Sequence, residues 1–506
     1  MTDPDLIGTV SRCEPSSDEE VVTRAGTALF SRPALAAVTT LVLAAAVQWI
    51  PGLERVRVFS RPAAPEPTPA PLAAPDLSVG ESELLLASES RRELAQPDDA
   101  QLRKAARGPI GGSRDEPELP AIDAKEPPVP LTGGEHLSGF YEALARTAQK
   151  KPGAITRITH FGDSVIASDY VSGTLRRKLQ EQFGDAGHGF MLIANAWPAY
   201  FHNDVERWAS PGWKVSRVVG PLAADGWYGL GGVTFSAPAG ARARFGTASD
   251  GDFGRAVSRF VLAYVEQPGG GEIALALDGE EHERLSTDGP EKRVRYHEVS
   301  TTDGPHQLEV VTKTKQSRLL GVTMERDVPG VVLDAIGIQG ARIRFLDKQD
   351  DAHWAEQLRQ RASNLLVYQF GANESGDGFL YPMEDYYRTM KAVLLQGKAA
   401  LPNASCLVIA PMDRAAKRGD QLITIKVIPH LVKQQRKVAA EVGCGYFDTY
   451  EAMGGKGSMA TWVRRGLGQA DLTHPSAVGA QVIGNWIYRA LMQGYNAHLE
   501  ARQRQR

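Results

Sequence analysis

Two patterns of hydrophobic and polar positions divide the chain after residue 131. In the first pattern, short apolar runs that end near glycine alternate with longer stretches in which apolar residues recur every three or four positions. Short runs of this kind predict buried strands, and the longer stretches predict amphipathic helices. The predicted strands lie within the segments 154–162, 330–340, 364–375, 404–413 and 446–452, of which 330–340 and 364–375 end in glycine-rich turns. They alternate with predicted helices at 134–150, 165–184, 383–397 and 477–495 and with a long helix that ends near residue 445. This alternation predicts an α/β fold whose parallel sheet is covered on both faces.

The second pattern fills the middle of the chain, from Ala194 to about Asp327. Residues 292–300 and 306–314 alternate polar and apolar positions, as half-buried antiparallel strands do. Two further apolar runs flank the Pro-Gly-Gly-Gly turn at 268–271, which predicts a β-hairpin. The pattern predicts an all-β sandwich at 194–330, inserted between two parts of the α/β domain at 134–193 and 331–500.

Aromatic residues of this middle region have two possible roles. The four that could stack on sugar rings are Trp208, Trp213, Trp227 and Tyr228. For any one of them, a place in the core of the sandwich is the favoured interpretation. Among them, Trp227 is a candidate substrate-binding residue.

The N-terminal part predicts a membrane anchor on a spacer. After a polar tail at 1–32, residues 33–53 contain no charged side chain, and about 20 apolar residues can span a bilayer as a helix. Gln48, Trp49 and Ile50 stand where a signal peptide would need small residues for cleavage, so an uncleaved anchor is favoured. The Pro- and Ala-rich residues 54–133 predict a semi-rigid linker without a packed core.

The orientation of this anchor is a separate question. Arginines stand on both sides of it, at Arg24 and Arg32 before it and at Arg55, Arg57 and Arg61 after it. Their number favours a cytoplasmic location for the residues that follow. The long spacer and the chemistry below favour the opposite, a body held outside the cytoplasm, at a cell surface or in a periplasm, and this is the location we expect.

Net charge and cysteine spacing argue against some classes of function. The net charge is −3 over 506 residues, so no basic surface for nucleic acid is expected. Cys13, Cys406 and Cys444 show neither CxxC spacing nor a nearby histidine cluster, which argues against a zinc site and against a disulfide framework. Cys406 and Cys444 are predicted to be buried core residues.

Chemistry-bearing residues follow several of the predicted strands, where active sites of parallel sheets lie. Ser164 follows Gly162 and Asp163 at the end of the first strand. By itself the Gly-Asp-Ser sequence also suits a turn and helix N-cap. Asn373 follows a later strand, where its amide could stabilise an oxyanion or simply adopt a turn conformation.

Two more signals complete the set. Asp471 precedes His474 by three residues, so the carboxylate could hold the imidazole in one tautomer and leave its other nitrogen to accept a proton from a serine. The alternative is a turn that caps the last helix. Gly340 also ends a strand, where its N–H could be an oxyanion donor, or where glycine simply forms a turn.

In this order, the motifs resemble those of the SGNH (GDSL-type) hydrolase family, over about 137–190 and 331–495. The resemblance implies a flavodoxin-like, three-layer, doubly wound sheet and no metal or cofactor. It implies Ser164 as the nucleophile, His474 as the base and Asp471 as its orienting partner. It also implies Gly340 and Asn373 as oxyanion donors, with Gly337 as the competing position for the glycine.

An inserted β-sandwich is similar to the arrangement in peptidoglycan O-acetylesterases, and residues 447–466 resemble envelope-associated members, with Trp462 as a possible wall of the cleft. We therefore expect a serine esterase that removes O-acetyl groups from an envelope polysaccharide such as peptidoglycan. An O-acetyltransferase with the same residues, and an anchored carbohydrate-binding protein with an idle domain, are the alternatives. A lipase or thioesterase is disfavoured because no long apolar segment near the motifs could form a lid. The sequence makes no prediction of oligomeric state.

Overall fold

The structure is a computed structural model, and it describes residues 127–198 and 200–505. The predicted tail and anchor, and nearly all of the predicted linker, lie outside the described residues. Within the described part of the chain, no helix combines the length and the hydrophobicity that a bilayer crossing requires.

A central parallel sheet organises what we call the α/β body, residues 127–188 and 330–505. Its five strands are β1 (Ile155–Gly162), β13 (Gly330–Gly337), β14 (Leu365–Gln369), β15 (Ser405–Ile409) and β18 (Gly445–Phe447). They lie in the order β13-β1-β14-β15-β18, and every neighbouring pair is parallel. Counted along the body, this is the order 2-1-3-4-5 of flavodoxin-like sheets. The predicted fold class is confirmed.

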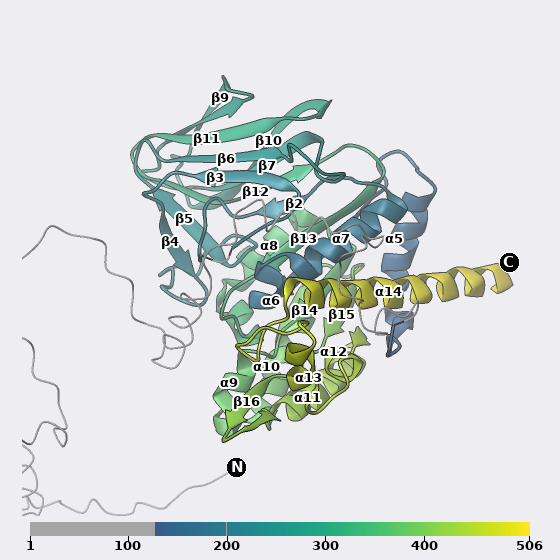
Figure 1. Cartoon of the computed structure of the whole chain (residues 1–506). Coiled ribbons are helices and arrows are strands. Elements are labelled where there is room, and N and C mark those ends of the chain that lie inside the picture. The colour runs from purple at the N-terminus through teal and green to yellow at the C-terminus, as the bar shows by residue number, and fades with distance from the viewer. Residues whose placement is uncertain (1–126, 199, 506) are drawn as a thin grey trace, which may run out of the picture. The chain divides into compact units, whose positions relative to one another are not determined.

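Helices pack on both faces of this sheet, as Figure 1 shows. One face is covered by α5 (Ser138–Ala148), α6 (Ser164–Ala167), α7 (Tyr170–Phe183) and α14 (Ala477–Gln505), which share a core with inward-facing residues of the strands. The other face is covered by α8 (Asp351–Arg361), α10 (Met383–Ala400) and α11 (Ile428–Val442). The strands are buried on both sides, which is why they appear in the sequence as continuous apolar runs.

Short elements complete the body. They are η2 (Gly134–Leu137), η3 (Ile343–Lys348), α9 (Glu374–Asp377), η4 (Gly378–Leu380), the hairpin of β16 (Ala415–Arg418) and β17 (Gln421–Thr424), α12 (Thr449–Ala452) and α13 (Ser458–Arg464). Several of them follow the carboxyl ends of the parallel strands. They carry the loops from which the candidate site is built.

Two antiparallel sheets form the β insert, residues 189–329. The larger sheet contains β2 (Gly189–Met191), β4 (Lys214–Arg217), β5 (Val233–Ala237), β7 (Val257–Glu266), β10 (Arg293–Gly304) and β12 (Ser317–Glu325). The smaller sheet has the order β3 (Val205–Ala209), β6 (Arg242–Thr247), β11 (Gln307–Thr314), β8 (Glu272–Leu277) and β9 (Glu280–Ser286). Buried residues of both sheets belong to one hydrophobic core, so the sheets pack face to face. The first strand, β2, lies before the predicted boundary at 194.

The predicted hairpin across residues 268–271 is wrong. β7 belongs to the larger sheet and β8 to the smaller one, so the glycine-rich turn carries the chain from one sheet to the other. A Cβ atom at Gly270 would lie 2.0 Å from the Thr287 carbonyl oxygen, and one at Gly271 would lie 1.9 Å from that of Thr314. These glycines are present because the crossing chain passes against neighbouring backbone, not because of hairpin geometry.

The β insert and the α/β body are joined by a buried ionic network. Glu325 of β12 is 3% exposed, and it accepts hydrogen bonds from Arg157 of β1 at 2.8 Å and from Arg259 of β7 at 2.6 Å, and a further one from Arg361 of α8. Burial by itself would raise the pKa of the Glu325 carboxyl, but the surrounding arginines hold it well below its usual range. Arg361 also donates to buried Asp334 of β13 at 2.6 Å. The insert and the body therefore share this charged network, and buried residues of both also belong to one hydrophobic core.

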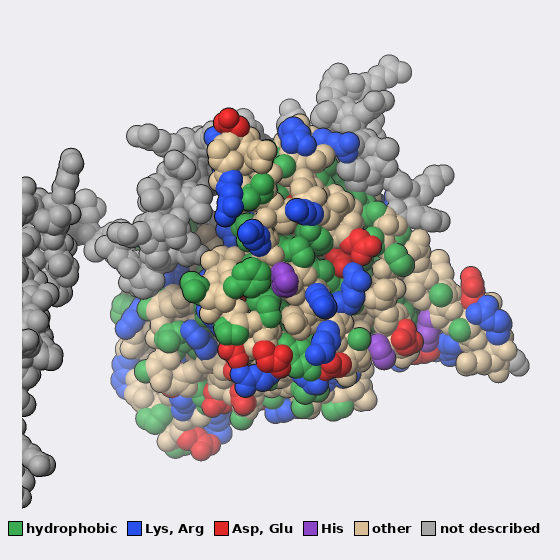
Figure 2. Space-filling view, turned by 90° about the horizontal axis from the view of Figure 1, so that it is seen from below, with side chains coloured by type: hydrophobic (Ala, Val, Ile, Leu, Met, Phe, Trp, Pro, Cys, Tyr) green, Lys and Arg blue, Asp and Glu red, His purple; other side chains and the backbone are tan. Residues whose placement is uncertain are grey.

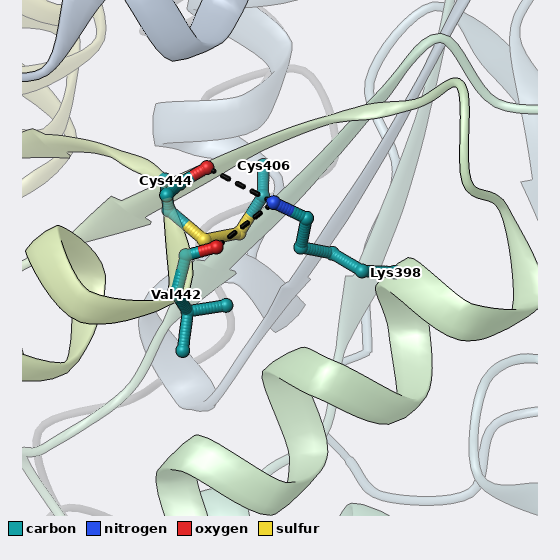
Figure 3. The surroundings of a disulfide bond; sticks show 5 residues. Lys398, Cys406, Val442 and Cys444 are labelled. Carbon is teal, nitrogen blue, oxygen red and sulfur yellow. Dashed lines mark hydrogen bonds between the residues drawn. A yellow bond between two sulfur atoms is a disulfide. The ribbon is translucent and has the colours of Figure 1, made fainter.

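Cys406 of β15 and Cys444, just before β18, are both 1% exposed and form a disulfide. Their burial agrees with the prediction, whereas the bond between them corrects the expectation that these cysteines form no disulfide. Its cause is topological: β15 and β18 are neighbours, so residues 38 apart in sequence meet across the sheet. Beside the disulfide, the Lys398 ammonium donates to the carbonyl oxygens of Val442 at 2.9 Å and Gly443 at 3.2 Å, where α11 ends (Figure 3).

Candidate active site

Ser164 stands at the junction between β1 and α6. Asp163 caps this short helix, because its Oδ1 accepts a hydrogen bond from the Val165 N–H at 3.0 Å. A Cβ atom at Gly162 would lie 2.4 Å from a side-chain carbon of Ile166, so only glycine allows the chain to turn this closely from strand into helix. The turn leaves the Ser164 side chain partly exposed at the carboxyl edge of the sheet.

Ser164, His474 and Asp471 are brought together in one hydrogen-bonded chain. The Ser164 Oγ lies 2.7 Å from His474 Nε2, and His474 Nδ1 lies 2.5 Å from Asp471 Oδ2. The other carboxylate oxygen of Asp471 accepts the backbone N–H groups of Thr473 at 2.9 Å and His474 at 3.0 Å. The loop before α14 is thereby folded around the carboxylate. In this geometry the Nδ1–H of His474 points to Asp471, and Nε2 is free to accept the serine proton.

The carboxylate of Asp471 is held in its charged form. Burial alone would raise its pKa, but the hydrogen bond and charge of His474 and two backbone N–H groups outweigh burial and lower it. A charged Asp471 stabilises a positive imidazolium beside it. The pair can therefore store a proton taken from Ser164.

Asn373 and Gly340 lie in neighbouring loops. The Asn373 amide, at the start of α9, donates to the Ala341 carbonyl at 3.0 Å, directly after Gly340. Gly340 has φ +78°, a left-handed conformation that favours glycine. Gly337, the competing position, has another role: a Cβ atom there would lie 1.9 Å from the Ala167 backbone nitrogen, so this glycine allows α6 to pack on β13. Among the described residues, no hydrogen bond links Asn373 or Gly340 to Ser164.

Arg414, which sequence reasoning missed, connects the loops of the site. Its Nε donates to Thr473 Oγ1 at 2.9 Å, in the histidine loop. Its Nη1 donates to the Ala372 carbonyl at 2.9 Å and to Ser375 Oγ at 3.0 Å, on either side of Asn373. Arg414 also lines a small cavity with Asp163 and Thr473. The sequence feature that could have identified Arg414 is its position directly after the predicted strand segment at 404–413.

Two buried carboxyl groups lie behind the site and were also missed. Burial raises the pKa of Asp163 to about 6, although the Val165 N–H and the charges of His474 and Arg414 oppose the shift. Burial likewise raises the pKa of Glu374 to about 7, despite a hydrogen bond of 2.8 Å from the Ile343 N–H. Glu374 is 1% exposed and directly follows Asn373. No sequence signal separates such a buried carboxyl from the many exposed ones.

The two candidate substrate-binding tryptophans do not contact the cleft. Trp462 is 1% exposed and packs edge-on against Trp486 in the core of the body, so it forms no wall. Trp227 stacks on His353 of α8 with ring centroids 4.5 Å apart, and the Lys292 ammonium lies 3.9 Å from its ring centre. Since His353 occupies one face of this ring and Lys292 the other, no face is left for a sugar. Both predictions are corrected.

The remaining aromatic candidates of the insert differ from one another. Tyr228 is 1% exposed and is a core residue, as favoured. Trp213 is partly buried and packs edge-on against Phe235 at the margin of the core. Trp208 of β3 is 49% exposed. Among the described residues, no group of three or more His, Cys, Asp or Glu side chains is arranged to hold a metal ion. The face shown in Figure 2 mixes charged and hydrophobic side chains, with a histidine near its middle.

The sheet order, the serine at the first strand-to-helix turn and the hydrogen bonds from Ser164 through His474 to Asp471 are similar to those of SGNH-type hydrolases, which are carboxylic ester hydrolases. Residues 300–482 match the model of the GDSL-like lipase/acylhydrolase family. This segment includes Gly340 and Asn373, whereas Ser164 precedes it.

Solved structures extend the comparison. A peptidoglycan O-acetylesterase is similar over 71% of this chain and 96% of its own, with 23% sequence identity and a TM-score of 0.61, which shows a common fold. A family two carbohydrate esterase from Cellvibrio japonicus has 12% identity over 58% of this chain and 98% of its own, with a TM-score of 0.24. A salicylyl-acyltransferase from a tetracycline biosynthetic pathway has 14% identity, the same coverage and a TM-score of 0.25. No curated protein matches the chain.

Proposed function

We propose that this chain is a serine esterase that removes O-acetyl groups from a polysaccharide of the cell envelope. The observation that carries the proposal is the hydrogen-bonded chain from Ser164 through His474 to Asp471, with distances of 2.7 and 2.5 Å. These three groups have the order and contacts that activate a serine for attack on an ester. The common fold with a peptidoglycan O-acetylesterase supports the choice of an acetylated glycan.

The reaction we propose has two steps. In the first, Ser164 Oγ attacks the acetyl carbonyl carbon while its proton passes to His474 Nε2, and the tetrahedral intermediate then expels the sugar oxygen, which takes that proton. In the second, a water oxygen attacks the acetyl-serine carbonyl, and the water proton passes through His474 to Ser164 Oγ as acetate leaves. One ester and one water thus give one alcohol and one acid.

Charge develops on the carbonyl oxygen in both tetrahedral intermediates. Asn373 and the turn at Gly340 are the proposed donors to this oxygen, because they lie side by side at the sheet edge. In the structure the Asn373 amide donates to the Ala341 carbonyl, so we expect it to exchange this bond, or share it, when the substrate is bound.

The proposed location is outside the cytoplasm. The disulfide between Cys406 and Cys444 supports it, since disulfides persist in oxidising compartments. The predicted anchor and linker would then hold the body near an envelope polymer. A reporter that functions only outside the cytoplasm, fused after Leu131, should be active, and a cytoplasmic result would contradict this part of the proposal.

The test of the activity is release of free acetate by the full chain from O-acetylated peptidoglycan and acetylated xylan, alongside p-nitrophenyl acetate, butyrate and octanoate. We expect acetate esters to be the preferred small substrates, and Ser164→Ala to abolish all hydrolysis without changing the melting temperature. Full activity of Ser164→Ala would remove this serine from the mechanism. Transfer of acetyl to a sugar hydroxyl, without free acetate, would identify an acetyltransferase instead.

A further inference from the structure

The outward face of the smaller sheet carries an unusual set of side chains. In the register, Trp208 of β3 lies opposite Arg244 of β6, and Gly246 of β6 lies between Glu206 of β3 and Gln307 of β11. Directly opposed residues share a face of a sheet, so these five positions face the same way. The alternate positions, among them Phe245 and Leu308, are fully buried in the core.

This face is hollowed into a groove. Glu206 and Gln307 both line a groove of about 600 Å³. The Gln307 side chain lies over Gly246, since a Cβ atom at this glycine would be 3.5 Å from it. Phe201 and His202, from the loop before β3, also line the groove. Val205 and Arg207, which alternate with Glu206 and Trp208 along β3, line it too, so the groove runs along the edge strand β3 and the loop before it.

Trp208 forms the exposed aromatic part of the groove. Its side chain is 49% exposed, and the Arg244 guanidinium lies 5.0 Å from its ring centre. A large aromatic ring left open beside planar polar groups is a suitable surface for a sugar, because the ring stacks on the apolar C–H face while amide, carboxylate and guanidinium groups bond the hydroxyls. Arg244 is itself fixed by a hydrogen bond of 2.8 Å to Glu309.

His202 is a buried residue beneath the wall of the groove. It is 4% exposed, and its Nδ1 hydrogen-bonds His188 Nε2 at 2.8 Å. Its Nε2 is buried and has no hydrogen-bond partner among the described residues. A buried polar atom without a partner is costly, and an enclosed water beside it would satisfy it. This nitrogen is closed to solvent, so it offers no contact to a ligand in the groove.

The groove is connected to the candidate active site. The Phe201 N–H donates to the Ala167 carbonyl at 3.3 Å, and Ala167 ends the short helix that begins with Ser164. Three residues along a helix correspond to a rise of about 4.5 Å. One wall of the groove is thus hydrogen-bonded to the helix that begins with the candidate nucleophile.

We infer that this groove binds a glycan segment of the substrate, with Trp208 as the stacking platform and Glu206 and Gln307 as partners of sugar hydroxyls. The inference rests on the proposed function, because it assigns the polymer part of that substrate. It places recognition on the open face of the smaller sheet, at residues that do not belong to the hydrogen-bonded chain of Ser164.

Binding and turnover are tested separately. In the full chain carrying Ser164→Ala, retention on O-acetylated peptidoglycan and on acetylated xylan is measured with and without Trp208→Ala. We expect Trp208→Ala to weaken binding to the preferred glycan roughly tenfold, and Trp208→Phe to restore most of it. Leu395→Ala is the matched control, since Leu395 is also an exposed apolar side chain (48%) but lies on α10.

In the active chain, Trp208→Ala should raise KM for the polymer by a similar factor and leave kcat/KM for p-nitrophenyl acetate within about twofold. Unchanged glycan binding, or failure of the Ser164→Ala chain to bind either glycan, would overturn the inference. An equal loss on the small ester would also overturn it, because Trp208 would then act through the site. Absence of any ester hydrolysis by the wild-type chain would instead overturn the proposed function, whatever the binding result.

Discussion

The parallel sheet of the α/β body and the antiparallel smaller sheet of the β insert present polar side chains in different ways. In the body, the polar residues of the site follow strand ends, and residues 310 apart in sequence, Ser164 and His474, come within 2.7 Å. In the insert, polar residues alternate along the strands and cover a face, as Glu206 and Trp208 do on β3. The carboxyl edge of a parallel sheet brings a few polar groups together around one reacting atom. An open sheet face instead offers many weaker contacts along a polymer.

The largest effect we expect is on kcat, from changes to the candidate catalytic residues at the edge of the parallel sheet. Ser164→Ala and His474→Ala should each lower kcat for p-nitrophenyl acetate by on the order of 10⁴-fold or more, because each removes a partner of the proton transfer. Asp471→Asn should cost less than His474→Ala, since it disturbs the tautomer and orientation of the base without deleting it. Single-turnover rates measure both. Equal losses for Asp471→Asn and His474→Ala would contradict the roles assigned to them.

A second prediction concerns the joint between the two regions. Glu325→Ala should lower the free energy of unfolding by about 3–5 kcal/mol, because it leaves Arg157, Arg259 and Arg361 without their buried carboxylate. Glu309→Ala is the control: its ion pairs with Arg242 and Arg244 lie at the surface, so about 1 kcal/mol or less is expected. Denaturant unfolding measures the difference. Two separate calorimetric transitions in the wild type would show that insert and body unfold independently, against this prediction.

A third prediction concerns the loops at the edge. Arg414→Gln should lower kcat for the small ester by about 10–100-fold with little change in KM, because the histidine and asparagine loops lose their common donor. Arg414→Lys should restore part of the lost kcat, because lysine keeps the positive charge but lacks the planar guanidinium that donates several hydrogen bonds. Arg418→Gln, on the exposed hairpin, is the control. A loss matched by a falling melting temperature would indicate a merely structural role.

The smallest effect concerns pH. Glu374 has a folded pKa of about 7, above its ordinary value of 4.5, so the stability it contributes is complete below about pH 4.5 and is lost as pH rises through 7. Glu374→Gln should remove this dependence of the free energy of unfolding on pH. It should also raise the free energy of unfolding at pH 8 by on the order of 2 kcal/mol. Unfolding at pH 5 and pH 8, with exposed Glu384→Gln as the control, measures it. An unchanged slope would show that Glu374 is charged throughout.

The two regions also differ in how far their sequence predicts them. The parallel sheet was predictable because its strands are buried on both faces and end in polar residues, and Ser164 could be named from that pattern. Asp471 and His474 were named instead from their spacing before the last helix. Trp227 and Trp462 could not be assigned correctly, because a tryptophan in the core and one on a binding face have the same sequence context. The partners of Arg414 lie on three loops, and the disulfide joins strands 38 residues apart, so both depend on topology that no local pattern contains.

The position of the β insert also sets the order in which the chain can fold. β1 and β13 are direct neighbours in the central sheet, yet their paired residues Thr159 and Asp334 are 175 apart in sequence. Closing so long a loop in an unfolded chain costs entropy before any contact compensates for it. Once β2 pairs with β12, the two ends of the insert lie side by side and this loop is already closed. We therefore expect the insert to become structured first and the central sheet to assemble onto it.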